Sequence, residues 1–400
     1  MTPILGERGP RDLVYLAPHS WEGIRQRAQH LATALAATRR VLYVEPVAPS
    51  LVGNLRRLAV GRRPGPWRGA LVRRGERVWS YTPPPLLPLT MDADGFNRLG
   101  HALVAPAVLR ALRGLGFESP VVVAGWPLAG TWAGRFGETT LLYDCMDDFP
   151  AFPGPRRRRR LLATAEAALV ARSTAVLATS EHLAAKWRPH HAAVHLLPNA
   201  VPAAFLATMA AGGVEPADLA AIPRPRLLYV GAIDRWLDEA ILVHLAARHP
   251  TWSLVLVGPM ATPLDELRRL PNVHLLGRRP HAALPDFLAA SDACLIPFTI
   301  SPLTVAVNPV KLYEYFAAGQ PVVSTALPEV ARYAPVCYLA SGPDGFELAA
   351  ARALGEAPDD PRRDERRRIA ADNTWERRAA RFDAILAALP PSAGGRGGVG

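Results

Sequence analysis

The sequence predicts an α/β protein made of two doubly wound, Rossmann-like domains. Short apolar runs, typical of buried strands, alternate with segments of helical spacing from residue 12 to residue 390. This alternation stops in a stretch rich in Ala, Gly and Pro, residues 203–225, and then starts again. In addition, 400 residues exceed what one ordinary core contains, so two domains are expected.

Residues 1–202 are expected to form the N-terminal domain. Runs that are apolar throughout favour parallel strands with both faces buried, and apolar residues three or four apart favour helices. Residues 48–75, rich in Pro, Gly and Arg, are expected to form a long loop or hairpin. The expected strands are 12–17, 40–45, 78–82, 121–125, 141–145 and 175–179, and the expected helices are 24–37, 96–112, 157–171 and one that begins at Ser180.

Residues 203–225 are expected to link the domains, and residues 226–372 to form the second domain. The segment 373–390 holds a last helix that is a candidate to cross back to the first domain, and the tail 391–400 is expected to be disordered. The expected strands are 226–230, 253–257, 273–276, 293–297, 321–324 and 336–339, and the expected helices are 237–248, 264–270, 284–290 and a short helix that ends at Gly319.

The net charge of +11 lies in the first half of the chain. Residues 1–200 hold 26 Lys and Arg against 14 Asp and Glu, whereas residues 201–400 hold 20 against 21. Such a surface fits either a solvated helix face and loop or a contact with anionic lipid. Nucleic acid is not an expected partner, because the arginines are not interleaved with aromatic residues. The concentrated arginines are Arg56, Arg57, Arg62, Arg63, Arg68, Arg73, Arg74, Arg77 and Arg156 to Arg160.

Several classes of protein are disfavoured. The three cysteines, Cys145, Cys294 and Cys337, are scattered and indicate neither a disulfide framework nor a zinc site. The N-terminus lacks the order of a signal peptide, and no run of 18 apolar residues occurs. A cytoplasmic protein is therefore expected, with the inner face of the plasma membrane as a peripheral location. The absence of GxGxxG after a strand and of GxxxxGK[ST] disfavours a dehydrogenase or a kinase.

The stretch NPVKLYEYFAAGQPVVST, residues 308–325, predicts an anion site. Its largely apolar helix places Lys311 and Glu314 on one face. The start of a helix carries unpaired N–H groups and partial positive charge, to which a lysine adds a full charge. The alternative interpretation is a surface ion pair between the two side chains. Strands that end in Gly231, Gly258 and Gly277 leave room for a ligand at the carboxyl edge of the same sheet.

This stretch, the preceding NVHLLGRRPHAALPDFLAASDACLIPF, PNAV at 198–201 and NTWERRAARF at 373–382 together resemble the glycosyltransferases of the GT-B fold that use nucleotide sugars. The resemblance is strongest to family four and its relatives that build bacterial surface polysaccharides. It implies that Asn308, Pro309 and Lys311 bind the donor diphosphate and that Glu314 binds the ribose hydroxyls. It implies no cofactor and no metal.

The resemblance also implies further donor contacts, and the sequence departs from the family pattern at one position. Arg235 is a candidate second phosphate contact, and Gly277 and Arg278 would lie by the nucleobase through backbone groups. Family four often has two glutamates separated by seven residues, and the first would fall at Ala306 here. An inverting reaction, which needs a base for the acceptor hydroxyl, therefore stays open.

The segment LLYDCMDDFPAF offers candidate catalytic residues in the first half. Asp144, Asp147 and Asp148 follow an apolar strand, and crowded carboxylates repel, so one should have a raised pKa and serve as base or acid. The resemblance matches Asp147 to a cleft-facing aspartate of the related transferases, with Met146 in the place of their histidine. A helix N-cap and loop role, or a Mg²⁺ site, are the alternatives.

His19, Glu22 and Trp126 are candidates for acceptor contacts, with helix capping or core packing as alternatives. The leading functional prediction is a glycosyltransferase that moves a sugar from a nucleoside-diphosphate sugar to a hydroxyl of a polysaccharide or lipid-linked acceptor. The alternatives are a nucleotide-sugar 2-epimerase of the same fold and an inactive scaffold in a polysaccharide assembly complex.

Overall fold

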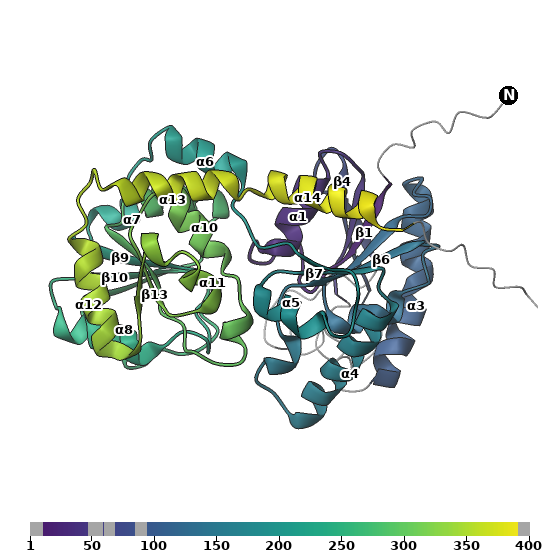
Figure 1. The fold of residues 1–400 in the computed structure, drawn as a ribbon, viewed down its shortest axis with the longest axis horizontal. Helices are drawn as coiled ribbons and strands as arrows, with labels where there is room; N and C mark the ends of the chain where they lie inside the picture. The colour runs from purple at the N-terminus through teal and green to yellow at the C-terminus, as the bar shows by residue number, and fades with distance from the viewer. Residues whose placement is uncertain (1–10, 47–58, 60–68, 85–93, 391–400) are drawn as a thin grey trace, which may run out of the picture. The chain divides into compact units, whose positions relative to one another are not determined.

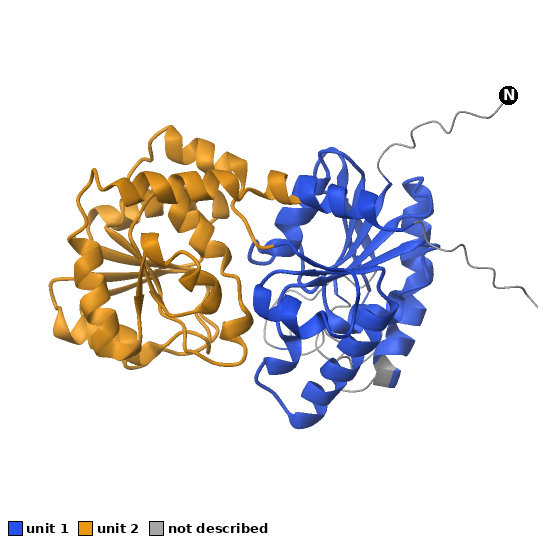
Figure 2. Cartoon of the chain, in the orientation of Figure 1, with its two compact units in different colours: residues 1–197, 379–400 blue, residues 198–378 orange. Residues whose placement is uncertain are grey.

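The computed structural model describes residues 11–46, 59, 69–84 and 94–390. The chain divides into two compact units: unit 1 comprises residues 1–197 and 379–400, and unit 2 comprises Pro198–Arg378 (Figure 2). Each unit is a largely parallel sheet with helices on both faces (Figure 1). The predicted fold class is therefore confirmed.

Unit 1 holds an eight-stranded sheet in the order β3-β4-β2-β1-β5-β6-β7-β8, in which only β3 runs antiparallel to its neighbour. The strand order reverses between β1 and β5, which is the switch point where ligands of such sheets bind. The strands are β1 Leu13–Leu16, β2 Val41–Val44, β3 Ala70–Arg73, β4 Val78–Thr82, β5 Val121–Ala124, β6 Thr140–Cys145, β7 Ala175–Ala178 and β8 Val194–Leu196. The helices are α1 Arg27–Leu35, α3 Asp94–Gly114, α4 Arg156–Arg172 and α5 Glu181–Trp187, with the 3₁₀ turns η1 Pro127–Trp132 and η2 Phe149–Ala151.

Unit 2 holds a six-stranded parallel sheet in the order β11-β10-β9-β12-β13-β14, with its switch point between β9 and β12. The strands are β9 Arg226–Val230, β10 Ser253–Val257, β11 Val273–Gly277, β12 Ala293–Ile296, β13 Val322–Thr325 and β14 Cys337–Ala340. The α-helices are α6 Ala203–Ala210, α7 Ala217–Ala220, α8 Glu239–Arg248, α9 Leu284–Ala289, α10 Val310–Ala317, α11 Pro328–Ala331, α12 Gly342–Leu354 and α13 Pro361–Asp372. The 3₁₀ turns are η3 Leu267–Arg269, η4 His281–Ala283, η5 Thr304–Ala306 and η6 Ala334–Val336.

The boundary between the units differs from the expected linker. Residues 203–225 form α6 and α7 within unit 2, because Phe205 and Leu219 are buried in its core. The chain passes between the units at Leu197 and Pro198 instead. The last helix, α14 (Trp375–Ala388), begins in unit 2, and its residues from Ala379 onward belong to unit 1.

Two further expectations need correction or fall outside the described residues. Residues 264–270 contain only the 3₁₀ turn η3 and no α-helix. The tail 391–400 and most of the segment 48–75 lie outside the residues that the structure describes, although 70–73 pair with β4 as a hairpin strand. Within the described residues, no helix has the length and apolar character needed to cross a bilayer.

Candidate functional site

The switch point of unit 2 brings together the residues of the predicted anion site. β9 ends at Val230 and is followed by Gly231, while Phe298 follows β12. Helix α10 begins beside both, with Pro309 as its N-cap and no side chain that caps its free N–H groups. The lysine in its first turn, Lys311, lies with its ammonium 5.0 Å from the ring centre of Tyr229 and 4.6 Å from that of Phe298.

Lys311 is a half-buried cation that lacks an anionic partner. In the part of the chain that the structure describes, no acceptor lies within hydrogen-bonding distance of its ammonium, and the surface ion pair with Glu314 is not formed. Burial lowers the pKa of Lys311 to about 8, and the nearby charge of Glu314 only partly opposes this. A Cβ built on Gly231 would lie 3.0 Å from Cε and Nζ of Lys311, so the glycine leaves the space that the lysine occupies.

Glu314 is held by a residue that the sequence did not single out. His281, in η4, places Nε2 2.8 Å from Oε1 of the nearly buried Glu314 carboxylate. The two residues are 33 positions apart, and no motif marks His281 as its partner. The contact fixes one carboxylate oxygen and orients the side chain within α10.

Asn308 supports the start of α10 from within. Its Oδ1 accepts a 2.9 Å hydrogen bond from the backbone of Asn199, whose side chain donates to the Asn308 carbonyl at 2.6 Å. The Asn308 amide nitrogen donates to Glu329 at 3.1 Å and to Tyr313 at 3.3 Å. These bonds use both ends of the Asn308 amide, so its side chain positions the helix start. The resemblance had implied instead that Asn308 binds the donor diphosphate.

The other predicted donor contacts lie on loops at the carboxyl edge of the same sheet. Arg235 is exposed, and its guanidinium has no partner among the described residues. Arg278 is exposed and follows Gly277 at the end of β11. Gly258 lies so close to the neighbouring strand turn that a Cβ on it would fall 1.8 Å from the Gly231 carbonyl oxygen.

In unit 1, Asp144 is not a catalytic base. Its carboxylate is fully buried and receives hydrogen bonds from Arg27 at 2.7, 2.9 and 3.0 Å and from the Tyr15 hydroxyl at 2.5 Å. Both oxygens are therefore neutralised by a structural ion pair, and none remains to take a substrate proton. Arg27 lies 117 residues away in the sequence, so no local signal could reveal the pair.

Asp147 has the properties that the sequence predicted for one member of this cluster. Its side chain is half-buried, and no hydrogen-bond donor or cation contacts it within the described residues. Its pKa is raised to about 7, chiefly by burial; Arg27 opposes this rise, and the nearby Asp148 and Asp144 contribute to it. A carboxyl group of this pKa can exchange a proton at neutral pH.

Asp148 belongs to a second internal network. Its carboxylate accepts a 2.8 Å bond from Lys186, which also donates at 2.9 Å to Glu166. The Tyr143 hydroxyl donates to the other oxygen of Glu166 at 2.7 Å. Asp148 is the N-cap residue of η2, which agrees with the helix N-cap alternative, but its side chain forms no capping hydrogen bond. Since protein cations hold Asp144 and Asp148, the arrangement does not support a Mg²⁺ site here.

A small cavity of about 10 Å³, enough for about one water molecule, lies at the switch point of unit 1, and one predicted acceptor residue, Trp126, lines it. His101 and Trp132 lie against one another in its wall, and burial lowers the pKa of His101 to about 3. The backbone N–H of Trp21 donates a 3.0 Å bond to Glu45, the pocket's one acidic residue. The lining residues are Leu16, Ala17, Val44, Glu45, Pro46, His101, Trp126 and Trp132.

The remaining two acceptor candidates, Glu22 and His19, lie in different surroundings. Glu22 is exposed and forms an ion pair with Arg74, so it is a surface contact of the β3 and β4 hairpin. His19 is half-buried in the loop after β1, and burial lowers its pKa, which keeps the imidazole neutral. Neither lines the pocket that contains Trp126.

Sequence comparisons identify relatives over most of the chain. Residues 224–355 match the family Glycosyl transferases group 1. TuaH of Bacillus subtilis, named as a glycosyltransferase of teichuronic acid biosynthesis, is 28% identical over 392 residues, which cover 90% of this chain and 94% of that protein.

Solved structures share the fold over nearly the whole chain. Sucrose-phosphate synthase from Thermosynechococcus elongatus superposes with a TM-score of 0.70 at 18% identity, covering 95% of this chain and 99% of that one. A UDP-forming α,α-trehalose-phosphate synthase from Burkholderia vietnamiensis gives 0.67 at 14% identity, with 96% and 98% covered. HepE of Anabaena, solved with UDP and glucose, gives 0.63 at 16% identity, with 95% and 100% covered.

Proposed function

We propose that this chain, a GT-B glycosyltransferase of the bacterial polysaccharide type, transfers a sugar from a nucleoside-diphosphate sugar. The acceptor is a hydroxyl of a polysaccharide or of a lipid-linked molecule. One observation carries the donor assignment. A half-buried lysine without an anionic partner lies in the first turn of α10, at the switch point of unit 2. A diphosphate supplies the charge that this position lacks.

Unit 2 would stabilise the leaving group. As the bond from sugar to diphosphate breaks, negative charge grows on the departing phosphate oxygens. Lys311 and the free N–H groups of α10 would stabilise that charge more in the transition state than in the ground state. Arg235 would add a second cation, Glu314 would accept from the ribose hydroxyls, and the backbone at Gly277 and Arg278 would lie by the base. No metal is part of this mechanism.

Asp147 of unit 1 would act on the acceptor. Its pKa of about 7 and its free carboxylate suit a general base that removes the proton of the attacking hydroxyl. A base in this role belongs to an inverting reaction, which agrees with Ala306 standing where related retaining enzymes have a glutamate. His19 and Trp126 would contribute to the acceptor region.

The donor is tested by titrating the purified protein with UDP-, GDP- and dTDP-sugars in a calorimeter, and the reaction by incubating the bound donor with candidate acceptors. We expect one nucleotide class to bind and the product to have an inverted anomeric centre by NMR. Failure of every donor to bind would refute the proposal. Isomerisation of the donor without acceptor would indicate an epimerase, and a retained anomeric centre would remove Asp147 as the base.

We also propose that unit 1 binds an anionic membrane surface through the start of α4, on the inner face of the plasma membrane. Arg156 to Arg160 open this helix and are all exposed. Five cations at the positive end of a helix dipole are unfavourable for the helix itself, which supports a role in binding anions. Phe149 and Phe152 stack on each other at 6.0 Å in the turn before it. Arg56, Arg57, Arg62, Arg63 and Arg68 lie outside the described residues, whereas Arg73, Arg74 and Arg77 bond to neighbouring groups of unit 1.

Flotation with lipid vesicles tests this surface. We expect the protein to float with vesicles that contain phosphatidylglycerol and not with phosphatidylcholine alone, and to be released by salt. Reversing Arg157 and Arg160 to glutamate should abolish flotation. Reversing Arg268 and Arg269, two exposed arginines of unit 2, changes the net charge equally and should not. Equal loss in both variants would show that net charge alone, not α4, drives binding.

A further inference from the structure

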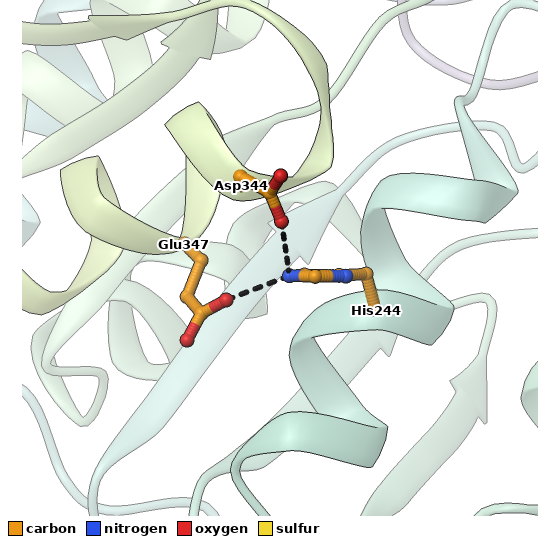
Figure 3. Close-up of side chains that lie close together, drawn as sticks. All are labelled: His244, Asp344 and Glu347. Atoms are coloured by element: carbon orange, nitrogen blue, oxygen red, sulfur yellow. Dashed lines mark hydrogen bonds and ion pairs between the residues drawn. The ribbon is translucent and has the colours of Figure 1, made fainter.

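Helices α8 and α12 of unit 2 bring three side chains with metal-binding atoms to one point (Figure 3). His244 projects from α8, and Asp344 and Glu347 project from consecutive turns of α12. The His244 Nε2 atom lies 2.6 Å from Oε2 of Glu347 and 3.4 Å from Oδ1 of Asp344. One ligand atom from each residue falls within 4.8 Å of the others. None of these residues takes part in the proposed transfer reaction.

From this geometry, we propose that His244, Asp344 and Glu347 form a binding site for a divalent transition-metal ion such as Zn²⁺, which would join α8 to α12. An imidazole with two carboxylates is a ligand set that Zn²⁺ accepts, with water completing its coordination. Mg²⁺ prefers oxygen ligands alone, so the imidazole disfavours it.

Two of the three separations between ligand atoms, both measured from His244, are close to those of a tetrahedral site. Bonds of 2.0–2.2 Å in a tetrahedral site place ligand atoms about 3.4 Å apart. The separation between His244 and Asp344 already has this value, and Glu347 needs to withdraw by less than about 1 Å. The Asp344 side chain is 94% exposed, so an ion can reach the site directly from solvent.

A second set of contacts orients Glu347 as the supporting groups of a metal site do. Its other oxygen, Oε1, lies 2.8 Å from Nε2 of His249. The His249 ring is fixed by stacking on Trp252, with ring centres 3.7 Å apart and an angle of 7°. Ligating carboxylates are commonly held by such hydrogen bonds, and losing the supporting group weakens metal binding 10- to 100-fold. Arg248 lies 3.9 Å from the carboxylate, but its exposed side chain can turn away.

The test titrates Zn²⁺ into the tag-free full chain, first dialysed against a chelator, with Co²⁺ as a spectroscopic probe and Mg²⁺ as a comparison. We expect one Zn²⁺ per chain, a visible Co²⁺ spectrum typical of mixed nitrogen and oxygen ligands, and no competition from Mg²⁺. His244→Ala, Glu347→Gln and Asp344→Asn should each weaken Zn²⁺ binding at least about ten-fold. Because Asp344 is exposed, its variant isolates metal binding from folding.

His274→Ala is the matched control, since His274 is a half-buried histidine of β11 in the same unit. It should leave Zn²⁺ binding unchanged. In thermal melts, Zn²⁺ should raise the melting temperature of the wild type and of His274→Ala but not of Asp344→Asn. Absence of Zn²⁺ binding, equal binding of Mg²⁺, or binding that survives in Asp344→Asn and His244→Ala would overturn the proposal and leave a plain ion pair between the helices.

Discussion

Lys311 is a half-buried cation without an anionic partner among the described residues, so the donor should bind in a pH-dependent way. Burial lowers the pKa of Lys311 to about 8, and the ammonium is lost as the pH rises through that value. We expect the affinity for UDP to fall between pH 7 and pH 9.5 in the wild type. Lys311→Met should bind weakly at every pH and lower kcat by about 10²- to 10³-fold, the effect of removing one such group.

Lys311→Arg provides the control, because its guanidinium stays charged over this range. UDP titrations at several pH values should show that this variant lacks the alkaline loss of affinity. An identical pH dependence in Lys311→Met and the wild type would mean that another group titrates.

The ionisation of Asp147 should affect the pH dependence of both the enzymatic activity and the free energy of unfolding. If its carboxylate is the base, activity should rise with pH to a plateau above pH 7, and Asp147→Asn should lower kcat by about 10²- to 10⁴-fold. The raised pKa means that the ionised form destabilises the fold, a cost that is absent below about pH 4, grows toward pH 7 and is complete above it. Urea unfolding should therefore show Asp147→Asn to be more stable than the wild type at pH 8 and equal to it at pH 4.

Single residues were predictable only where their role depends on the local chain. Lys311 lies in the first turn of a helix and Asp147 lies just after a buried strand. Both positions can be recognised from the local sequence, which singled out both residues. The partners that decide what neighbouring residues do come from distant positions. Arg27 forms a structural ion pair with Asp144, and Asn199 hydrogen-bonds to the Asn308 side chain. Only the fold brings the members of each pair together.

At the scale of the elements, the turn after β10 depends on a glycine for steric reasons. A Cβ on Gly258 would overlap the Gly231 carbonyl oxygen at 1.8 Å, whereas Gly277 also has a positive φ, +69°, but open space around it. We expect Gly277→Ala to cost about 1 kcal/mol of unfolding free energy, the strain of a left-handed conformation. Gly258→Ala should cost several times more, since the turn must move. Chemical denaturation of both variants measures the difference, and equal costs would mean that the turn yields easily.

Elements with a strong pattern were predictable, and elements that depend on tertiary packing were not. β4, β9 and β10 have the predicted bounds, because a short, mostly apolar run favours a buried strand of a parallel sheet. The Ala-rich sequence of α6 lacks a clear polar face and therefore predicts a linker, whereas contact with the core of unit 2 stabilises a helix there. The charged α13 was not predicted either, and its buried Arg366 docks on Glu356 through bonds of 2.7 and 2.6 Å.

At the scale of the whole molecule, the two units divide the proposed reaction. Each has its own sheet, its own switch point and its own candidate groups: Lys311 and Glu314 in unit 2, and Asp147 in unit 1. α14 is the one helix of the described chain that contributes residues to both units. Because the doubly wound pattern repeats in the sequence, this division was predictable, whereas the passage of the chain at Leu197 was not.

This division predicts how the donor stabilises the protein. A ligand that binds only folded unit 2 stabilises it by mass action, by about 2.7 kcal/mol at a hundred times its Kd. For a unit of this size, that corresponds to a rise in melting temperature of about 5–10 °C. Scanning calorimetry of the full chain should therefore show two transitions, of which UDP moves only one, and Lys311→Met should abolish the movement. If UDP moved both transitions equally, α14 would couple the units into one cooperative fold, and donor binding in unit 2 would then be sensed directly in unit 1.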